Sequence, residues 1–177
     1  LMDEPFSHLD AITARKLRFD LVDILAPARP TILYVTHDLA EAVFLRDHLV
    51  RQIELADSTD DEDERTARLT FVVVGAGYTG TEVAAQGVLA TRATLRKHPR
   101  LRGRTPRWLL LDTADRVLPG LRERLSHTAS RTLTERGVEI MTGTSVKEAM
   151  AEGVLLSDGS SVPTRSLIWC VGVRPDP

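Results

Sequence analysis

Cysteine is almost absent from this chain, because a single thiol, Cys170, stands among its 177 residues. One cysteine excludes an intrachain disulfide framework, a site built from several thiolates and a redox-active CxxC pair. No apolar run approaches the ~20 residues of a membrane helix, and no apolar signal core follows a charged start. Charge of one sign is scarce too, since 23 basic and 25 acidic residues leave a net charge of −2. We therefore expect a cytoplasmic globular protein that binds no nucleic acid.

The first third of the chain combines a short buried strand with an amphipathic helix. Residues 31–36 are apolar and β-branched, which predicts a strand. Apolar residues then recur at helical spacing over residues 39–55. The acidic run 57–64, DSTDDEDE, comes next and has no apolar residues. It is interpreted as a solvated linker or as the cap of the next element.

The remainder alternates between apolar runs and helical patterns. Residues 69–74 form a continuous apolar run, typical of a parallel strand covered on both faces. Further predicted elements are a helix to residue 97, strands at 108–111, 138–141 and 167–170, a helix at 121–136, and short alternating strands around a turn at 157–160. This order predicts a Rossmann-like α/β domain with a parallel sheet and an inserted β-meander, preceded by a short, incomplete α/β fragment.

A glycine-rich turn follows the first apolar run of this domain and opens a helix. Gly75 is expected to make the tight turn, and Gly77 to let the backbone approach a pyrophosphate. Gly80 is expected to let the helix pack close to the strand. The amides of the helix N-terminus, with Tyr78 and Thr79 between the glycines, would stabilise the phosphate charge. A glycine turn that only packs a helix on a sheet is the structural alternative.

An acid ends the next strand, as a dinucleotide site requires. Asp112 would accept hydrogen bonds from the ribose hydroxyls and repel a 2′-phosphate, so NADH is preferred over NADPH. Arg116 is a counter-signal, because it could accommodate that phosphate. Thr81 and Glu82 stand where a triphosphate loop needs Lys and Ser or Thr, so ATP is disfavoured here.

Four segments of the second part resemble the NADH-binding domain of type II NADH dehydrogenases, within the FAD-dependent pyridine nucleotide-disulfide oxidoreductase family. They are LRDHLVRQIELAD, FVVVGAGYTGTEVAAQ, LLLDTADRVLP and LIWCVGVRPDP, in family order over residues 45–177. The resemblance implies that NADH binds at the glycine turn and reduces FAD, which then reduces a quinone at the cytoplasmic face of the membrane. It also implies that Glu82 lies near the nicotinamide and that Gly172 borders the cofactor. Glu82 could equally be a first-turn acid favoured by the helix dipole.

The resemblance also has gaps. Neither an earlier glycine fingerprint, nor a flavin-contacting segment, nor a membrane-attaching tail is found in these residues. We therefore expect the chain alone to be inactive in hydride transfer, and to associate with the flavin-binding parts that it lacks. Cys170 is expected to be a buried strand residue.

A second group of motifs precedes this domain. In LMDEPFSHLD, an acid pair after an apolar strand end could hold Mg²⁺ through Asp3 and orient a water through Glu4. With the later THD segment, these residues resemble the ATP-binding subunits of ABC transporters for nitrate, sulfonate or taurine, with His37 as the switch histidine. No phosphate-cradling lysine loop accompanies them, so bound Mg-ATP is not expected.

The chain is thus interpreted as three segments: a transporter fragment at 1–44, a helix and acidic linker at 45–68, and an NADH-binding domain at 69–177. An NADH-binding oxidoreductase component, an ATP-hydrolysing transporter fragment and a non-catalytic nucleotide-binding module are the competing hypotheses. The arginine-rich stretch 92–107 is interpreted as a solvated loop rather than a nucleic-acid or membrane surface. The histidines His8, His48, His98 and His127 are expected at the surface.

Overall fold

A computed structural model of the chain describes residues 32–35 and 39–171, with side chains described from residue 45 onward. In this part of the chain, the larger sheet has five strands, all parallel to their neighbours. From edge to edge it contains β1 (Ile32–Val35), β8 (Ser166–Trp169), β2 (Thr70–Val74), β3 (Arg107–Asp112) and β4 (Val138–Thr142). The succession β4-β3-β2-β8 is the strand order of a dinucleotide-binding half. The predicted Rossmann-like α/β class is therefore confirmed.

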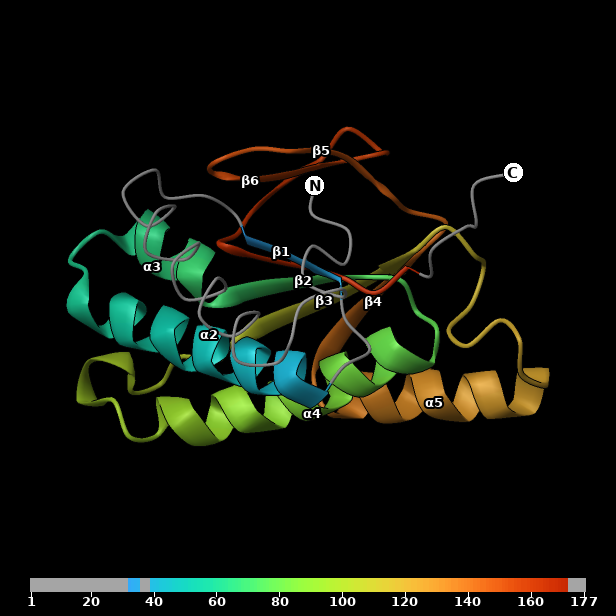
Figure 1. Cartoon of the computed structure of the whole chain (residues 1–177), viewed down its shortest axis with the longest axis horizontal. Coiled ribbons are helices and arrows are strands. Elements are labelled where there is room, and N and C mark those ends of the chain that lie inside the picture. The colour runs from blue at the N-terminus through green and yellow to red at the C-terminus, as the bar shows by residue number, and fades with distance from the viewer. Residues whose placement is uncertain (1–31, 36–38, 172–177) are drawn as a thin grey trace.

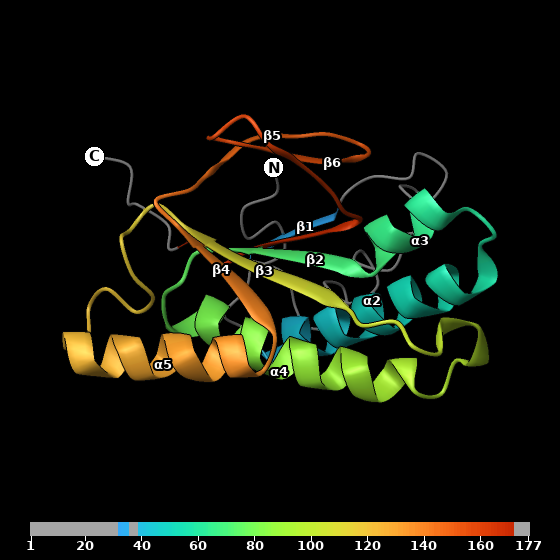
Figure 2. The same ribbon diagram turned by 180° about the vertical axis from the view of Figure 1, so that it is seen from behind.

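Helices cover one face of this sheet, as Figures 1 and 2 show. They are α2 (Leu39–Ser58), α4 (Tyr78–Leu95) and α5 (Glu123–Glu135). Side chains alternate across a strand, and so Phe71 and Val73 of β2 belong to the core beneath the helices. Trp108 of β3 is fully buried in the same core and stacks on Phe71, with ring centroids 4.8 Å apart.

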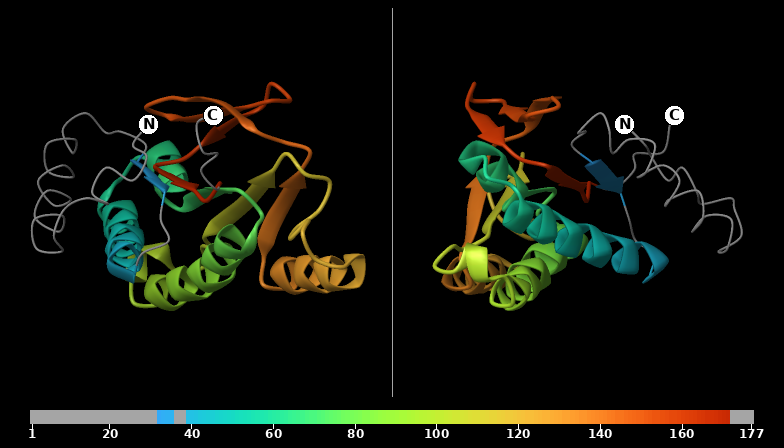
Figure 3. Two further views of the ribbon diagram at one scale, coloured as in Figure 1. Left: turned by 45° about the vertical axis from the view of Figure 1, so that its right-hand side comes forward. Right: turned by 90° about the vertical axis from the view of Figure 1, so that its left-hand side faces the viewer.

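The predicted meander forms a second layer on the opposite face of the sheet, visible from the side in Figure 3. Its antiparallel strands are β5 (Val146–Ala149), β6 (Gly153–Leu156) and β7 (Ser161–Pro163). Val72 and Val74 of β2 pack there against Val154 and Leu156 of β6. Because β2 is buried on both faces, its sequence is a continuous apolar run rather than an alternating one.

The acidic run is more structured than a solvated linker. It leads into a short helix, α3 (Glu62–Arg68), whose first amides are capped by Asp61. The Asp61 carboxylate accepts from the amides of Asp63 and Glu64 at 2.9 and 3.2 Å. The Glu64 side chain, only 10% exposed, pairs with Arg68 and with Arg165, each at 2.6 Å. The run therefore acts as a helix cap, the second of the two interpretations offered by the sequence.

The same acidic run also contacts the arginine-rich loop, which contains the 3-10 helix η2 (Pro99–Leu101). The pairs of this charged seam are Asp57 with His98 at 3.2 Å, Asp60 with Arg100, and Glu62 with Arg104 at 2.5 Å. The two segments were interpreted separately as solvated surfaces. Helices α2 and α4 pack side by side, so the segments that follow them lie at the same end of the molecule. There the opposite charges of the two segments attract each other.

The predicted surface position of His48 is wrong. Its side chain lies within α2 and is only 6% exposed, with Nε2 2.8 Å from the Ser166 hydroxyl of β8. Burial, assisted by the positive charges of Arg51 and Arg68, lowers the pKa of His48 to about 4. A single histidine on a helix gives little indication of which face it occupies, and here tertiary packing decided.

Candidate dinucleotide site

The glycine turn lies at the carboxyl end of β2, between its two neighbouring strands. Gly75 has a φ of +103°, in the region that favours glycine. A Cβ there would lie 2.9 Å from the carbonyl of Cys170, at the end of β8. On the other side, the Gly75 amide donates to the Leu111 carbonyl of β3 at 2.7 Å. The turn is therefore fixed by both neighbouring strands, and a side chain would clash with one of them.

Helix α4 starts directly above this turn with unsatisfied donors. Gly77 is its N-cap and offers no side chain to the first amides. Within the part of the chain that the structure describes, no group accepts a hydrogen bond from the amides of Tyr78, Thr79 or Gly80. A Cβ on Gly77 would meet nothing within 4 Å, so open space adjoins these donors. Free amides and the positive end of a helix dipole make this an anion-binding position.

Close packing of α4 on the turn depends on Gly80. A Cβ at this position would lie 1.8 Å from the Gly75 carbonyl oxygen, an atom of the backbone. No side-chain rearrangement can relieve a contact with the main chain. Gly80 is therefore required for the position of the helix rather than for space around a ligand, which is the role predicted for the third glycine.

Asp112 connects the end of β3 to the glycine turn. One carboxylate oxygen accepts from the Ala76 amide at 2.5 Å, and the other accepts from the Ala114 amide at 2.8 Å. Each carboxylate oxygen can accept further hydrogen bonds, and Asp112 is only partly buried. The side chain can thus hold the turn and still bind hydroxyl groups. The sequence did not reveal this structural contribution, nor the part played by the amides of Ala76 and Ala114.

The loop after β3 folds back onto the same turn. Leu118, with a φ of +52°, donates its amide to the Ala76 carbonyl at 2.8 Å. Arg116 donates from its terminal Nη2 to the Pro119 carbonyl at 3.2 Å. One end of that guanidinium is therefore held by its own loop, while its buried Nε has no hydrogen-bond partner among the described residues.

The other predicted residues lie around this turn or outside the described range. Tyr78 is 71% exposed at the first position of α4. Glu82 is exposed one turn further along the helix. Gly172 lies outside the described residues, as do Asp3, Glu4 and His37 of the transporter-like motifs.

The support beneath α4 was missed by the sequence reasoning. A Cβ on Gly87 would lie 2.1 Å from the Trp108 ring, so this glycine makes room for the indole. The Trp108 Nε1 donates to the Thr91 hydroxyl at 3.0 Å. A glycine inside a helical pattern was the available signal, since it often marks close packing.

Cys170 immediately follows β8, below the glycine turn. A Cβ on Gly80 would lie 3.3 Å from the Cys170 Cβ. Burial raises the pKa of this thiol to about 12, so the thiolate is scarce at neutral pH. The prediction of a buried strand residue is therefore only partly right, because Cys170 is half-buried and lies one residue past the end of the strand.

Residues 45–171, whose side chains the structure describes, contain neither a metal-ligand cluster nor a membrane-spanning helix. In that range, no three His, Cys, Asp or Glu side chains are grouped as metal ligands would be. None of its helices combines the length and apolarity needed to cross a bilayer.

The chain is similar in sequence and in fold to known NADH dehydrogenases. Type II NADH:quinone oxidoreductase NdhA of Mycobacterium tuberculosis is 36% identical over 144 residues, which are 77% of this chain and 30% of that protein. The structure of NDH2 from Plasmodium falciparum in complex with NADH has a TM-score of 0.66 at 17% identity, over 79% of this chain and 30% of that chain. This second likeness shows the fold.

A shorter stretch of the chain has a different relative. Nitrate import ATP-binding protein NrtD of Synechococcus elongatus is 52% identical over 50 residues, which are 28% of this chain and 18% of that protein. The predicted resemblance to ABC transporter ATP-binding subunits is thereby confirmed. The chain spans less than a third of the length of each of these three proteins.

One family model covers most of the chain. It is the pyridine nucleotide-disulphide oxidoreductase model, which matches residues 24–177. Together with the parallel sheet and the glycine turn, this match identifies the chain as a member of the pyridine nucleotide-disulphide oxidoreductase family.

Proposed function

We propose that this chain is the NADH-binding part of a flavin-dependent NADH:quinone oxidoreductase. The observation that carries the proposal is a group of three amides at the start of α4 that have no acceptor among the described residues, beside the open space at Gly77. These backbone donors can bind a pyrophosphate. The turn contains no lysine or arginine side chain that could neutralise the γ-phosphate of a triphosphate. The residues present thus fit a dinucleotide better than a nucleoside triphosphate.

Each residue of the turn has a proposed part in holding NADH. Gly75 and Gly80 shape the turn, while the amides of Tyr78, Thr79 and Gly80 bind the pyrophosphate. Asp112 accepts from the ribose hydroxyls with the lone pairs that its two amide contacts leave free. A 2′-phosphate would meet the same carboxylate, so NADH is favoured over NADPH.

The reacting end of the dinucleotide is assigned by family likeness. Bound NADH would supply a hydride, which FAD accepts in this family, and the similar mycobacterial protein is named for a quinone acceptor. We propose that Glu82 and Gly172 lie toward the nicotinamide. Glu82 is exposed on α4 and is therefore accessible to a ligand or to a flavin-binding partner.

The place of the reaction is likewise a proposal. We infer work at the cytoplasmic face of a membrane, where a quinone is accessible. The 177 residues contain one dinucleotide fingerprint, which we assign to NADH, so flavin must be held by other residues. The chain by itself is then expected to bind NADH without transferring hydride.

A transporter-like function is the second candidate, supported by the likeness to the nitrate importer subunit. In that reading residues 1–44 belong to an ATPase, 45–68 form the connecting helix and acidic segment, and 69–177 form the NADH domain. Asp3 would bind Mg²⁺ with ATP, Glu4 would orient water and His37 would sense the γ-phosphate. A non-catalytic nucleotide-binding module is the third candidate.

Titration of the purified chain with NADH, NADPH and ATP separates these candidates. The readout is tryptophan fluorescence, because Trp169 ends β8 beside the glycine turn and Trp108 lies beneath α4. Saturable quenching by NADH, weaker with NADPH and absent with ATP, is the expected result. Gly77→Ala is expected to weaken NADH binding while leaving the fold intact, since its side chain would enter open space.

The remaining outcomes decide against the proposal. Failure to bind any nucleotide would overturn it. Magnesium-dependent ATP hydrolysis that is lost in Glu4→Gln would favour the transporter candidate. NADH binding without any electron transfer, even after flavin and a quinone are added with the flavin-binding parts of a relative, would favour the non-catalytic module.

A further inference from the structure

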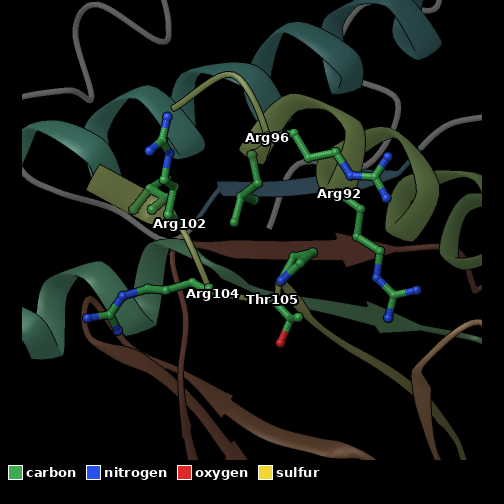
Figure 4. Close-up of a pocket in the computed structure, with 9 residues that line it drawn as sticks. Arg92, Arg96, Arg102, Arg104 and Thr105 are labelled. Carbon is green, nitrogen blue, oxygen red and sulfur yellow. The ribbon is translucent and has the colours of Figure 1, made fainter. Parts of the chain in front are cut away.

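A second concave site lies at the opposite end of α4 from the glycine turn. This groove encloses about 480 Å³ between the end of α4 and the loop that enters β3 (Figure 4). Helix α4 has 18 residues and is therefore about 27 Å long. Strand β3 begins at this end and finishes at Asp112, so the groove is at the amino edge of the sheet and separate from the proposed NADH site.

Arginine side chains form the rim of the groove, above a floor of apolar groups. Leu95 and Leu101 are 4% and 1% exposed and close the bottom together with Pro106. Arg96, Arg102 and Arg104 are exposed on the rim, and Arg92 is half-buried. Figure 4 shows Arg92 and Arg96 extending to one side of the opening and Arg102 and Arg104 to the other, so the guanidinium groups do not meet at one central point.

Most of this positive charge is uncompensated within the described residues. Arg104 pairs with Glu62 at 2.5 Å. Arg92, Arg96 and Arg102 make no ion pair or side-chain hydrogen bond with any other residue that the structure describes. The Arg92 guanidinium lies against Gly137, where an added Cβ would be 2.3 Å from its Nη2. The carboxyl end of α4 carries roughly half a negative charge through its dipole, which offsets only a small part of the two exposed charges of Arg96 and Arg102.

The charged seam shows which chemistry this basic loop binds. Arg100 and Arg104 engage carboxylates of the acidic run at Asp60 and Glu62, and Arg100 also donates to the Thr59 carbonyl at 3.4 Å. The ligand of that half of the loop is therefore an acidic polypeptide segment. The arginines on the groove side have the same chemistry, but no segment of the described chain covers them.

We propose that the arginine-rimmed groove binds an acidic peptide segment of a partner protein. A single phosphate cannot contact guanidinium groups that point in different directions, whereas carboxylates spaced along a peptide can reach them in turn. The floor accepts an apolar side chain between the acids. Single-stranded nucleic acid is disfavoured, because the lining contains no aromatic ring on which a base could stack.

A direct binding measurement with matched variants tests this proposal. The probe is a labelled synthetic peptide in which glutamates flank two leucines, followed by fluorescence anisotropy against the full 177-residue chain. In Arg96→Gln/Arg102→Gln, binding is expected to weaken by about tenfold, as the loss of two exposed charge pairs implies. Arg124→Gln/Arg131→Gln removes the same charge from exposed positions of α5 and is expected to change binding by less than about twofold.

Two controls keep the result interpretable. Thermal unfolding and NADH titration of both double variants should match the parent chain, because neither pair touches the glycine turn. Arg96→Lys/Arg102→Lys keeps the charge but loses bidentate contacts, so its affinity should lie between those of the parent chain and the glutamine variant.

Several outcomes would overturn the proposal. One is the absence of peptide binding, and another is equal weakening by the groove and α5 variants, which would mean non-specific attraction. Tighter binding of tripolyphosphate or of a single-stranded oligonucleotide than of the peptide would assign the groove to another ligand class.

Discussion

The two ends of α4 recognise anions by different means. At its start, three backbone amides find no acceptor among the described residues, and the adjacent Gly77 has no side chain. At its end, arginine side chains line a groove, and in the same loop Arg100 and Arg104 pair with acids 40 and 42 residues away in sequence. Backbone recognition leaves a signature in glycine spacing. Side-chain recognition between distant segments leaves only two charged runs whose meeting the fold decides.

The largest effect is expected from adding a side chain where α4 contacts the glycine turn. In Gly80→Ala the new Cβ would overlap the Gly75 carbonyl oxygen, which is main chain. We expect a destabilisation of about 3 kcal/mol and loss of detectable NADH binding. Chemical denaturation and the fluorescence titration measure the two effects.

Gly87→Ala is the matched control for this substitution. Its Cβ would overlap the Trp108 ring, so it should destabilise the chain through the same helix. The folded fraction should still bind NADH, because the turn itself is untouched. If Gly80→Ala kept full affinity, backbone recognition at this end of α4 would be refuted.

Burial of His48 in α2 should make the free energy of unfolding depend on pH. Its pKa is lowered from 6.5 to about 4 by burial, so between these values the unfolded chain binds more protons than the folded chain. Stability should therefore fall as the pH is lowered through this window, by at most about 3 kcal/mol. Urea denaturation at several pH values measures the slope.

Two substitutions identify the group responsible for that slope. His48→Gln should lower stability at neutral pH but flatten the dependence. His127→Gln, at an exposed position of α5, should leave the slope unchanged. An undiminished slope in His48→Gln would exclude His48 as the titrating group.

A smaller effect is expected at the ribose end of the dinucleotide site. Asp112→Ala should relax the preference for NADH over NADPH by about tenfold, because a repulsive carboxylate is removed. It should also loosen the turn, since two amide contacts are lost. Competitive titration with both dinucleotides gives the ratio.

Asp112→Asn separates the two contributions, because an amide oxygen can still accept from one backbone N–H. It should retain more stability than Asp112→Ala while losing the same selectivity. Asp115→Ala, an exposed acid in the following loop, should change neither. Unchanged selectivity in both Asp112 variants would remove the proposed ribose role.

The smallest effect belongs to the charged seam. Glu62 and Arg104 are 60% and 40% exposed, so a double-mutant cycle with glutamine at both positions should give a coupling of about 0.5 kcal/mol. The coupling should decrease in high salt. A coupling of zero at low salt would mean that helix packing brings these charges together and that the ion pair adds nothing to the free energy of unfolding.

The sequence predicted the elements of the domain well, because their signals are local. The apolar run before Gly75 became β2, and the acid after the next run became the last residue of β3. It did not predict the burial of His48, the indole beside Gly87 or the pairing of the acidic run with the arginine loop. These features join residues far apart in sequence, and no local period records them.

The sequence by itself determined the parallel α/β order, the glycine turn and the family, because strand burial and positive-φ turns restrict residue types position by position. Only the tertiary structure decided that Asp112 fastens the turn through two amides and that Glu64 is paired in the interior. It also decided which arginines are neutralised and which remain around an open groove. Electrostatic interactions depend on the distance between charges in space, so only the folded chain determines which charged side chains are paired and which line an open site.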